Sequence, residues 1–351
     1  MECMTQNLFI GIDLGGTKIS TALVDASGRI VARDYRETMA AGGQKVVVER
    51  MVDAARRVIS EAGVVFSQVT GVGVGSPGPI DSRIGVVTAP PNLPGWKDVP
   101  LKQLIEERLG ITTFLENDAN AAALGEYRFG AGQGVQNMIY VTVSTGIGGG
   151  LILNGQLYSG TIGTAGEIGH TTVLPQGPYC GCGNRGCLEA LASGTAIARE
   201  GRELVQRGVP TLIAALAEGN PERVTARLVA EAAEQGDIEA QEILAEAMAY
   251  LGVGMANLVN LFNPELIVIG GGLTHLGEKL FRPVRRAIER RAFPAAARVV
   301  QVVPAQLGDD AGVLGAAAVA MAQMASTTVD DSLTRRYVAP TGDSRRQTNS
   351  R

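Results

Sequence analysis

Aromatic residues are scarce in this sequence, since Phe, Trp and Tyr make up only 4% of 351 residues. Few side chains are therefore available to stack on the bases of single-stranded nucleic acid. An excess of positive charge is also missing, because 31 Lys and Arg stand against 35 Asp and Glu and leave a net charge of −4. That balance argues against a general polyanion-binding surface, so we expect no nucleic-acid partner.

A secretory signal and a long apolar run are missing as well. The N-terminus has no basic stretch leading into a long apolar segment. The stretch of lowest polarity, residues 312–322, is too short to cross a bilayer and indicates a buried helix. We therefore expect a cytoplasmic protein without a membrane partner. Cysteine is rare, with four residues, and without an export signal a metal site is the expected use of the three that lie close together.

Glycine, in contrast, is abundant, with 46 residues, about twice its usual share of ~7%. Three glycine turns each follow an expected apolar strand, at residues 13–18, 144–150 and 270–272. Glycine lets backbone N–H groups approach a phosphate closely. None of the turns has the spacing of a P-loop or a dinucleotide fingerprint, and one turn alone is a weak signal. Three turns together predict a phosphate-binding site, in which Asp13 is suited to hold hydrated Mg²⁺.

Short apolar runs alternate with helical periodicity along the chain, which is typical of an α/β fold. We expect strands at residues 8–13, 19–24, 29–33, 69–75, 112–116, 138–143, 150–153, 266–269 and 299–303. Helices are expected at residues 44–62, 101–109, 276–290 and about 310–325, with a helix-rich stretch over 193–262. Residues 326–351 have little apolar content and no period, so we expect them to be disordered.

The strand–turn–strand pattern at the N-terminus occurs a second time. Placing Ser144 on Asp13 and Gly146 on Gly15 gives an offset of 131 residues and keeps strand, turn and strand in register. A repeat of this length indicates internal duplication of a domain rather than the period of a solenoid. The alternative is that the two glycine hairpins are unrelated.

Asp118 stands where an expected strand leads into an alanine-rich helix. A general base must be a carboxylate held at a fixed position within hydrogen-bond reach of a hydroxyl group. Asn or Asp at such a position is more commonly a simple helix N-cap. The two roles are compatible for the neighbours Asn117 and Asp118.

A compact group of metal-binding residue types lies near the middle of the chain: His170, Cys180, Cys182 and Cys187. One imidazole and three thiolates form a four-ligand tetrahedral set for zinc of the structural kind. An incidental cysteine cluster is the alternative. Because protein would fill all four positions, no site remains for a metal-bound water, and we do not expect zinc to perform the chemistry.

Glu167 and Glu189 flank this group. A zinc ion would fold the intervening loop back and bring the two carboxylates together. Paired acids are also found in glycosidases, but hydrolysis has no need of three phosphate-type turns. We therefore expect both to accept hydrogen bonds from a polyol, with two solvated surface glutamates as the alternative.

Seven segments stand out together: IGIDLGGTKI (residues 10–19), SPGPID (76–81), ENDANAAALGE (116–126), VSTGIGGGLILNG (143–155), GEIGH (166–170), CGCGNRGCLEALASG (180–194) and NPELIVIGGG (263–272). Their combination resembles the ROK family of sugar kinases and repressors. The resemblance covers residues 8 to about 324 and implies an actin-like ATPase fold, with two ribonuclease-H-like lobes around a central cleft. The small lobe would comprise residues 8–116 and the helix at about 310–325. The large lobe would comprise residues 117–309 with the zinc-binding loop.

The resemblance also implies a role for each matching residue. Asp118 would be the general base that takes the proton from the sugar 6-hydroxyl, and His170 would bind zinc with one ring nitrogen and sugar with the other. Further sugar contacts would come from Gly78, Asn117, Glu167 and Glu189. ATP phosphates and magnesium would be held at Asp13, Gly15, Gly16, Thr17, Lys18, Thr145, Gly146 and Gly148, and adenosine at Gly270, Gly271 and Gly272.

The choice of sugar depends on a short loop. Residues 92–96, Asn-Leu-Pro-Gly-Trp, resemble the loop of the family's glucokinases, so we expect glucose to be the substrate. N-acetylmannosamine kinases, N-acetylglucosamine kinases and broad hexokinases share most of these motifs and remain alternatives. A DNA-binding repressor is not expected with only seven residues before Leu8, while a non-catalytic sugar sensor is a further alternative. The resemblance implies a homodimer or homotetramer.

Overall fold

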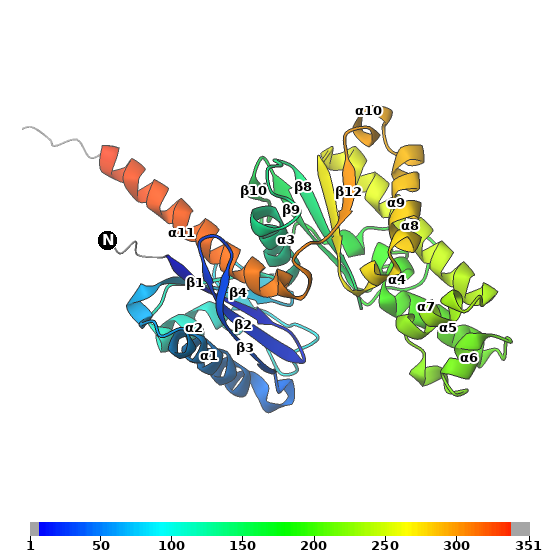
Figure 1. Ribbon diagram of the computed structural model, residues 1–351, viewed down its shortest axis with the longest axis horizontal. Coiled ribbons are helices and arrows are strands. Elements are labelled where there is room, and N and C mark those ends of the chain that lie inside the picture. The colour runs from blue at the N-terminus through cyan, green and yellow to red at the C-terminus, as the bar shows by residue number, and fades with distance from the viewer. Residues whose placement is uncertain (1–6, 338–351) are drawn as a thin grey trace, which may run out of the picture.

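Two five-stranded sheets, one from each half of the chain, form the framework of the protein (Figure 1). This computed structural model describes residues 7–337. The first sheet contains β1 (Leu8–Leu14), β2 (Lys18–Asp25), β3 (Ile30–Glu37), β4 (Val69–Ser76) and β7 (Thr113–Asn117), in the order β3-β2-β1-β4-β7. The second contains β8 (Met138–Val143), β9 (Ile147–Leu153), β10 (Gln156–Leu157), β11 (Leu266–Gly270) and β12 (Gln301–Pro304), in the order β10-β9-β8-β11-β12. The expected α/β class is confirmed.

The two sheets have the same topology. In the first, β1, β2 and β3 pair antiparallel, and β4 and β7 continue the sheet parallel to β1. In the second, β8, β9 and β10 pair antiparallel, and β11 and β12 continue it parallel to β8. Two unrelated hairpins would have no reason to agree in order and direction through a whole sheet. The topology therefore supports internal duplication.

The central strands of the first sheet are buried on both faces, because helices cover each side. Ile10 and Ile12 of β1 belong to one apolar cluster with residues of α1 (Gly43–Glu61) and α2 (Leu101–Leu109). Phe9 belongs to a second cluster with residues of α11 (Ala311–Tyr337). Consecutive apolar residues, instead of an apolar–polar alternation, are expected for a strand covered on both faces.

Helix α11 returns from the second half of the chain to the first sheet and packs on β1 and β4. The helix lies directly against glycines of these strands. A Cβ atom added at Gly11 would collide with the carbonyl group of Val313, and one added at Gly73 would collide with that of Ala316. The absence of side chains at these positions is what lets the helix approach the sheet.

The end of α11 differs from the expectation. The helix does not stop near residue 325 but extends to Tyr337. It therefore includes residues 326–337, the first part of the expected tail. This segment contains neither proline nor glycine, and an established helix is extended at little cost by one further hydrogen bond per residue. Residues 338–351, the rest of the expected tail, lie outside the described residues.

Helix α3 (Asp118–Phe129) connects the two sheets. It follows β7 of the first sheet directly but packs on β8 and β9 of the second. It also crosses α11, where Gly125 faces Gly315. Glu126 is fully buried and accepts the backbone N–H groups of Gln306 and Leu307, at 2.9 and 2.8 Å, in the segment that leads into α11. The two halves are thus joined at α3 and its contacts.

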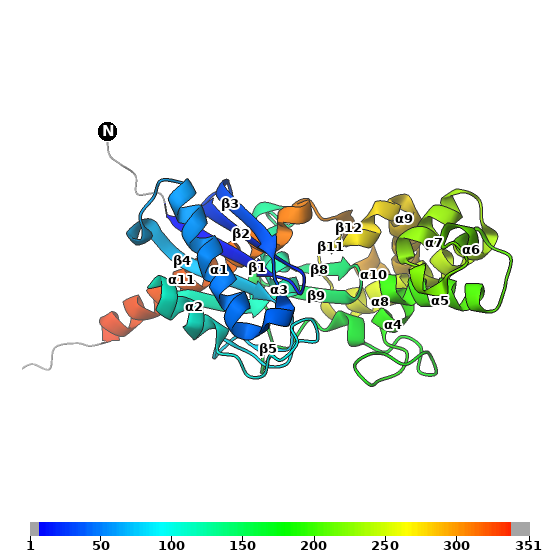
Figure 2. The same ribbon diagram turned by 90° about the horizontal axis from the view of Figure 1, so that it is seen from below.

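The remaining α-helices gather on the second sheet, at the end away from the first (Figure 2). They are α4 (Leu188–Ala192), α5 (Gly194–Gln206), α6 (Leu212–Leu216), α7 (Ala226–Glu234), α8 (Ile238–Phe262), α9 (Glu278–Arg291) and α10 (Pro294–Ala297). By length and composition α8 would suffice to cross a membrane. However, Leu251 and Met255 are fully buried and Gly252 packs against Ala287 of α9, so the apolar character of α8 is explained by its place in the core.

Candidate active site

The junction between β7 and α3 fixes Asn117 and Asp118. Asn117 is the N-cap of α3, and its Oδ1 accepts the N–H groups of Ala119 and Asn120 at 2.9 and 3.3 Å. Asp118 is the first helical residue, and its Oδ1 accepts the Ala119 N–H at 2.8 Å. The capping interpretation therefore applies to Asn117. Among the described residues, no side chain donates a hydrogen bond to the second carboxylate oxygen of Asp118.

The protein surroundings raise the pKa of Asp118 to about 6, mainly through desolvation. The side chain is accessible to solvent, yet it is enclosed by enough protein atoms to lose much of its hydration. The negative charges of Asp13 and Glu167 raise this pKa further, whereas the Ala119 N–H lowers it. A carboxylate with a pKa near neutrality is suited to act as a general base.

Behind this pair lies a buried carboxylate that the sequence analysis treated only as the end of a strand. Glu116 Oε1 accepts the Asn117 N–H at 2.9 Å and the Asn120 Nδ2 at 3.0 Å. Burial raises the pKa of Glu116. Because these bonds link the strand end to the first turn of α3, Glu116 helps to fix the direction in which Asn117 and Asp118 point.

One loop of the first lobe borders Asn117, and another packs on the first glycine turn. A Cβ added at Gly78 would lie 3.4 Å from Nδ2 of Asn117, so this loop approaches the same side chain. A Cβ added at Gly16 would lie 2.8 Å from Cβ of Asn92. The loop expected to influence the choice of sugar, residues 92–96, therefore packs on the first glycine turn.

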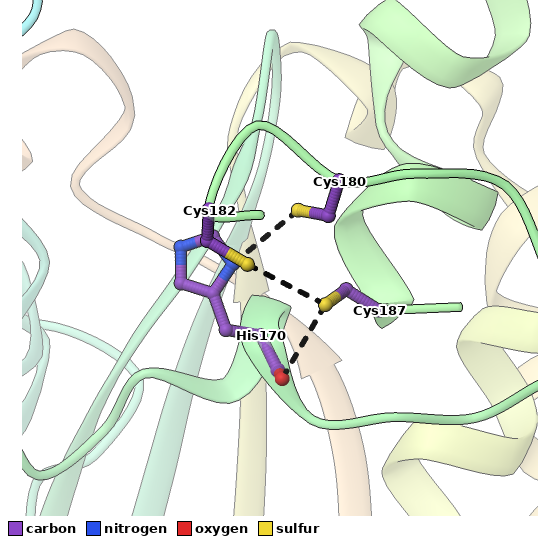
Figure 3. Close-up of side chains that lie close together, drawn as sticks. All are labelled: His170, Cys180, Cys182 and Cys187. Carbon is purple, nitrogen blue, oxygen red and sulfur yellow. Dashed lines mark hydrogen bonds between the residues drawn. The ribbon is translucent and has the colours of Figure 1, made fainter. Parts of the chain in front are cut away.

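His170, Cys180, Cys182 and Cys187 converge on one point, as expected (Figure 3). All ligand atoms lie within 4.8 Å of one another, with His170 Nδ1 3.6 Å from Cys180 Sγ and the Sγ atoms of Cys182 and Cys187 3.7 Å apart. Zinc bonds of ~2.3 Å to sulfur and ~2.1 Å to nitrogen place tetrahedral ligand atoms about 3.6–3.8 Å apart. The donor set and its spacing fit a zinc ion with four protein ligands.

The electrostatics of this cluster also favour a cation. Burial, together with contacts with Cys182 and Cys180, raises the pKa of Cys187 to about 12. Three thiolates in this space would repel one another, and a divalent cation removes that repulsion. Gly186, with φ of 66°, lets the chain turn back between the second and third cysteines.

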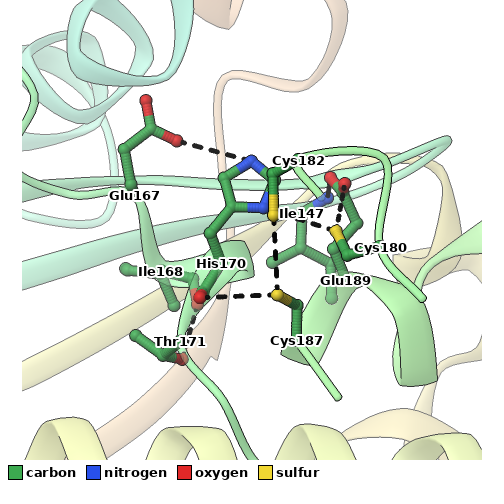
Figure 4. A network of polar contacts seen from close by, with 9 residues as sticks. All are labelled: Ile147, Glu167, Ile168, His170, Thr171, Cys180, Cys182, Cys187 and Glu189. Carbon is green, nitrogen blue, oxygen red and sulfur yellow. Dashed lines mark hydrogen bonds and ion pairs between the residues drawn. The ribbon is translucent and has the colours of Figure 1, made fainter. Parts of the chain in front are cut away.

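His170 presents its two ring nitrogens to different neighbours (Figure 4). Nδ1 faces the thiols, while Nε2 lies 3.9 Å from Oε2 of Glu167. Gly169 packs against the carbonyl group of Ile147 in β9, which fixes the short helical turn that carries both side chains. One nitrogen can thus serve a metal while the other remains on the side of Glu167.

Glu189 connects the zinc loop to the second glycine turn. Its Oε2 accepts the Ile147 N–H at 2.9 Å, and its Oε1 lies 3.9 Å from Cys180 Sγ (Figure 4). A Cβ added at Gly146 would collide with this carboxylate. The structure therefore brings Glu167, His170 and Glu189 to one region, as the sequence analysis expected of a folded zinc loop.

The second and third glycine turns lie side by side. A Cβ added at Gly271 would lie 2.5 Å from the carbonyl oxygen of Val143, and one at Gly272 would lie 3.7 Å from Oγ of Ser144. Beside them a cavity of about 1000 Å³ opens in the second lobe. Its lining includes Thr145, Thr195, Arg202, Arg227, Gly272 and Leu276.

The part of this lining that comes from the helices was not among the residues expected from the sequence. Thr195 donates its hydroxyl hydrogen to the carbonyl oxygen of Thr145 at 2.8 Å, which ties the start of α5 to the second turn. Arg202 and Arg227 come from α5 and α7. No local motif marks these residues, because they reach the cavity only through the packing of helices that are distant from the turns in sequence.

The first glycine turn stands apart from this cavity, whose lining comes from the second lobe. Burial raises the pKa of Asp13, and the charge of Lys18 opposes that rise. The start of α11 packs on the Asp13 side chain, since a Cβ at Gly312 would collide with the carboxylate. Gly148, by contrast, has a packing role on the second turn, where it faces Ala119 of α3.

Known proteins resemble this chain over nearly its full length. The family model described as "ROK family" matches residues 9–323. A glucokinase of Thermotoga maritima is 42% identical over 310 residues, covering 88% of this chain and 96% of the relative. The crystal structure of a ROK family glucokinase from Streptomyces griseus with glucose and AMPPNP is 38% identical, with a TM-score of 0.75 over 90% of this chain and 100% of that one.

Regulators match as well. A xylose repressor of Caldicellulosiruptor bescii is 33% identical, covering 90% of this chain and 79% of the relative. The relatives of this chain therefore include both kinases and repressors. On the strength of the full-length match, the duplicated sheets and the converging motifs, the chain belongs to the ROK family.

Proposed function

We propose that the protein is an ATP-dependent kinase that phosphorylates the 6-hydroxyl of a hexose, with glucose as the preferred substrate. The observation that carries the proposal is Asp118, a carboxylate fixed at the start of α3 with its pKa raised to about 6. A group of this kind can take the proton from the attacking hydroxyl during phosphoryl transfer. The relatives named glucokinase support the choice of sugar.

The sugar would lie between the β7–α3 junction and the zinc loop. Asn117 uses its oxygen to cap α3, so its amide nitrogen, near Gly78, is the atom left for a sugar hydroxyl. Glu167 and His170 Nε2 face the same region and would accept or donate further hydrogen bonds. Glu189, already bound to the Ile147 N–H, would complete the polar set. Such a set orients the 6-hydroxyl toward Asp118.

The nucleotide would bind across the glycine turns. The cavity beside Gly272 has the size of a small-molecule site and would take the adenosine. Thr145 and Gly146 of the second turn, and Gly15 to Lys18 of the first, would hold the phosphates with backbone N–H groups. We assign Gly148 a supporting place in the second turn, because its contacts are with α3.

Two metal ions have suitable residues. Asp13 offers a hard carboxylate oxygen beside the first turn and would hold Mg²⁺, which would supply positive charge to offset that of the phosphates. His170, Cys180, Cys182 and Cys187 would hold structural zinc. The zinc loop then aims His170 Nε2 and keeps Glu189 against the second turn, so its contribution is the geometry of the sugar site.

The decisive experiment is an assay of ADP release with ATP, Mg²⁺ and a panel of glucose, mannose, fructose, N-acetylglucosamine and N-acetylmannosamine. Turnover mainly with glucose supports the full proposal. Preference for an acetylated sugar keeps the mechanism and replaces the substrate. The match to a xylose repressor favours one second candidate, a sugar sensor without catalysis. Sugar binding by calorimetry with no turnover on the whole panel would establish the sensor and overturn the kinase.

Assembly and location are further parts of the proposal. We propose a cytoplasmic homodimer or homotetramer, which is the assembly that the resemblance to the ROK family implies. Sedimentation of the purified chain tests the assembly. A monomer that turns over glucose at full rate would contradict it.

A further inference from the structure

Thr38 occupies an unusual place behind the first glycine turn. It follows β3 directly and is fully buried, although most of β3 is partly or fully exposed. Its hydroxyl group donates to the carbonyl oxygen of Gly15 at 2.6 Å, and its backbone N–H donates to the carbonyl oxygen of Thr17 at 2.9 Å. One residue thus binds two of the carbonyl groups of the turn.

These bonds leave the opposite side of the turn open. The Gly15 N–H is used within the turn, where it donates to the carbonyl oxygen of Lys18 at 2.8 Å. Across residues 7–337, no acceptor is found for the N–H groups of Gly16 and Thr17. Neighbouring N–H groups that are free while their carbonyl groups are bound from behind form a concave site for an anion.

Strand β3 also contacts the Lys18 side chain of the first glycine turn. Tyr35 of β3 is 65% exposed, and its ring lies beneath Lys18, with Nζ 5.7 Å from the ring centroid. A cation–π contact of this kind restrains a long side chain that would otherwise be free in solvent. β3 therefore contacts the turn twice, through Thr38 at the backbone and through Tyr35 at the ammonium group.

We infer that Thr38 is a positioning residue for nucleotide binding: it holds the Gly15 and Thr17 carbonyl groups so that the Gly16 and Thr17 N–H groups face the phosphates. This inference rests on the proposed function, because it takes the first turn to be a phosphate site. A positioning role differs from a merely structural one in its effect. Loss of the hydroxyl group should weaken nucleotide binding and leave sugar binding unchanged.

The test compares three variants. Thr38→Val removes the hydroxyl group and keeps the shape of the side chain, while Thr38→Ser restores the hydroxyl group. Thr21→Val is the matched control, because Thr21 is a fully buried threonine on the neighbouring strand β2 whose Oγ1 has no hydrogen-bond partner among the described residues. The measurements are calorimetric affinity for Mg²⁺–AMPPNP, KM for ATP, KM for glucose and the melting temperature.

For Thr38→Val we expect about five- to tenfold weaker AMPPNP binding and a matching rise in KM for ATP, the effect of one hydrogen bond. KM for glucose should stay at the wild-type value, Thr38→Ser should recover most of the affinity, and Thr21→Val should change neither constant. Unchanged AMPPNP affinity in Thr38→Val, or an equal loss in Thr21→Val, overturns the inference. Wild-type protein that binds AMPPNP but phosphorylates no sugar refutes the proposed function instead, and the binding comparison still decides the role of Thr38.

Discussion

At the scale of single residues, the proposed chemistry depends on the protonation of Asp118. Its pKa is raised to about 6, so the carboxylate is protonated and inactive as a base below that pH. We expect kcat/KM for glucose to fall tenfold per pH unit below about 6 and to level off above it.

We also expect Asp118→Asn to lower kcat by about 10²–10⁴-fold. Initial rates between about pH 5 and 8 measure both effects.

Stability provides the control for this variant. Because the pKa of Asp118 in the folded protein exceeds the ordinary value of 3.8, ionisation of the carboxylate disfavours folding as the pH rises through about 6. Asp118→Asn removes that charge and should melt no lower than the wild type at pH 8. A rate that does not change across pH 6, or a folded Asp118→Asn variant that keeps the wild-type kcat, would contradict the assignment of Asp118 as the base.

How far single residues could be predicted depends on whether their partners are close in sequence. The four residues proposed to bind zinc lie in short motifs, and their ligand atoms converge in the structure as expected. Asn117 and Asp118 are neighbours at the start of α3, as their motif predicts. Glu116 and Thr38 were missed, because a glutamate at a strand end and a threonine after an edge strand look unremarkable in sequence. Their meaning comes from hydrogen bonds that only the folded backbone reveals.

At the scale of elements, the loop proposed to bind zinc would position side chains of the sugar site. Cys182 is exposed, so Cys182→Ser removes one zinc ligand with little effect on the core. We expect Cys182→Ser to lower the zinc content of the protein. We also expect KM for glucose to rise by about 10–100-fold, because His170 and Glu189 lose their fixed geometry. KM for ATP should change far less. Elemental analysis with steady-state kinetics measures this, and a zinc-free variant with normal KM for glucose would disprove it.

The contact between α11 and the first sheet leads to a prediction about stability. A Cβ at Gly73 meets the α11 backbone at Ala316, whereas one at Gly71, on the same strand, has only ordinary contacts of 3.6–3.7 Å. Gly73→Ala should lower the free energy of unfolding by about 1–3 kcal/mol, typical of overpacking. Gly71→Ala should be neutral or slightly stabilising. Urea unfolding compares the two, and equal effects would mean that α11 does not lie on Gly73.

The strands and helices themselves were largely predictable, because each carries its own apolar period. The end of α11 was not, since low apolar content does not mark where a helix that is already formed will stop. The helical lining of the cavity beside the second and third glycine turns was also not predictable. Arg202 and Arg227 reach it only through the packing of α5 and α7 around the second sheet.

At the scale of the whole molecule, the two lobes must keep a defined relation while substrates enter and leave. Glu126 of α3 is a buried group that links the two halves of the chain. It accepts the Gln306 and Leu307 N–H groups in the segment before α11 and the Ala131 N–H after α3. Segments that absorb the motion between lobes commonly affect kcat and KM together when they are altered. A substitution at Glu126 should therefore change kcat and the KM values for both substrates together.

Glu126→Gln tests this directly. The amide offers one oxygen and one NH₂ group to a site that presents only N–H donors, so a buried donor is left unpaired, at a cost of about 1–3 kcal/mol in the free energy of unfolding. We expect KM for both substrates to rise and kcat to fall. Glu265→Gln is the matched control, because Glu265 also accepts two backbone N–H groups, those of Gln136 and Asn137, but within one lobe and in contact with water. If denaturant unfolding and steady-state kinetics respond equally to both substitutions, Glu126 does not control the relation between the lobes.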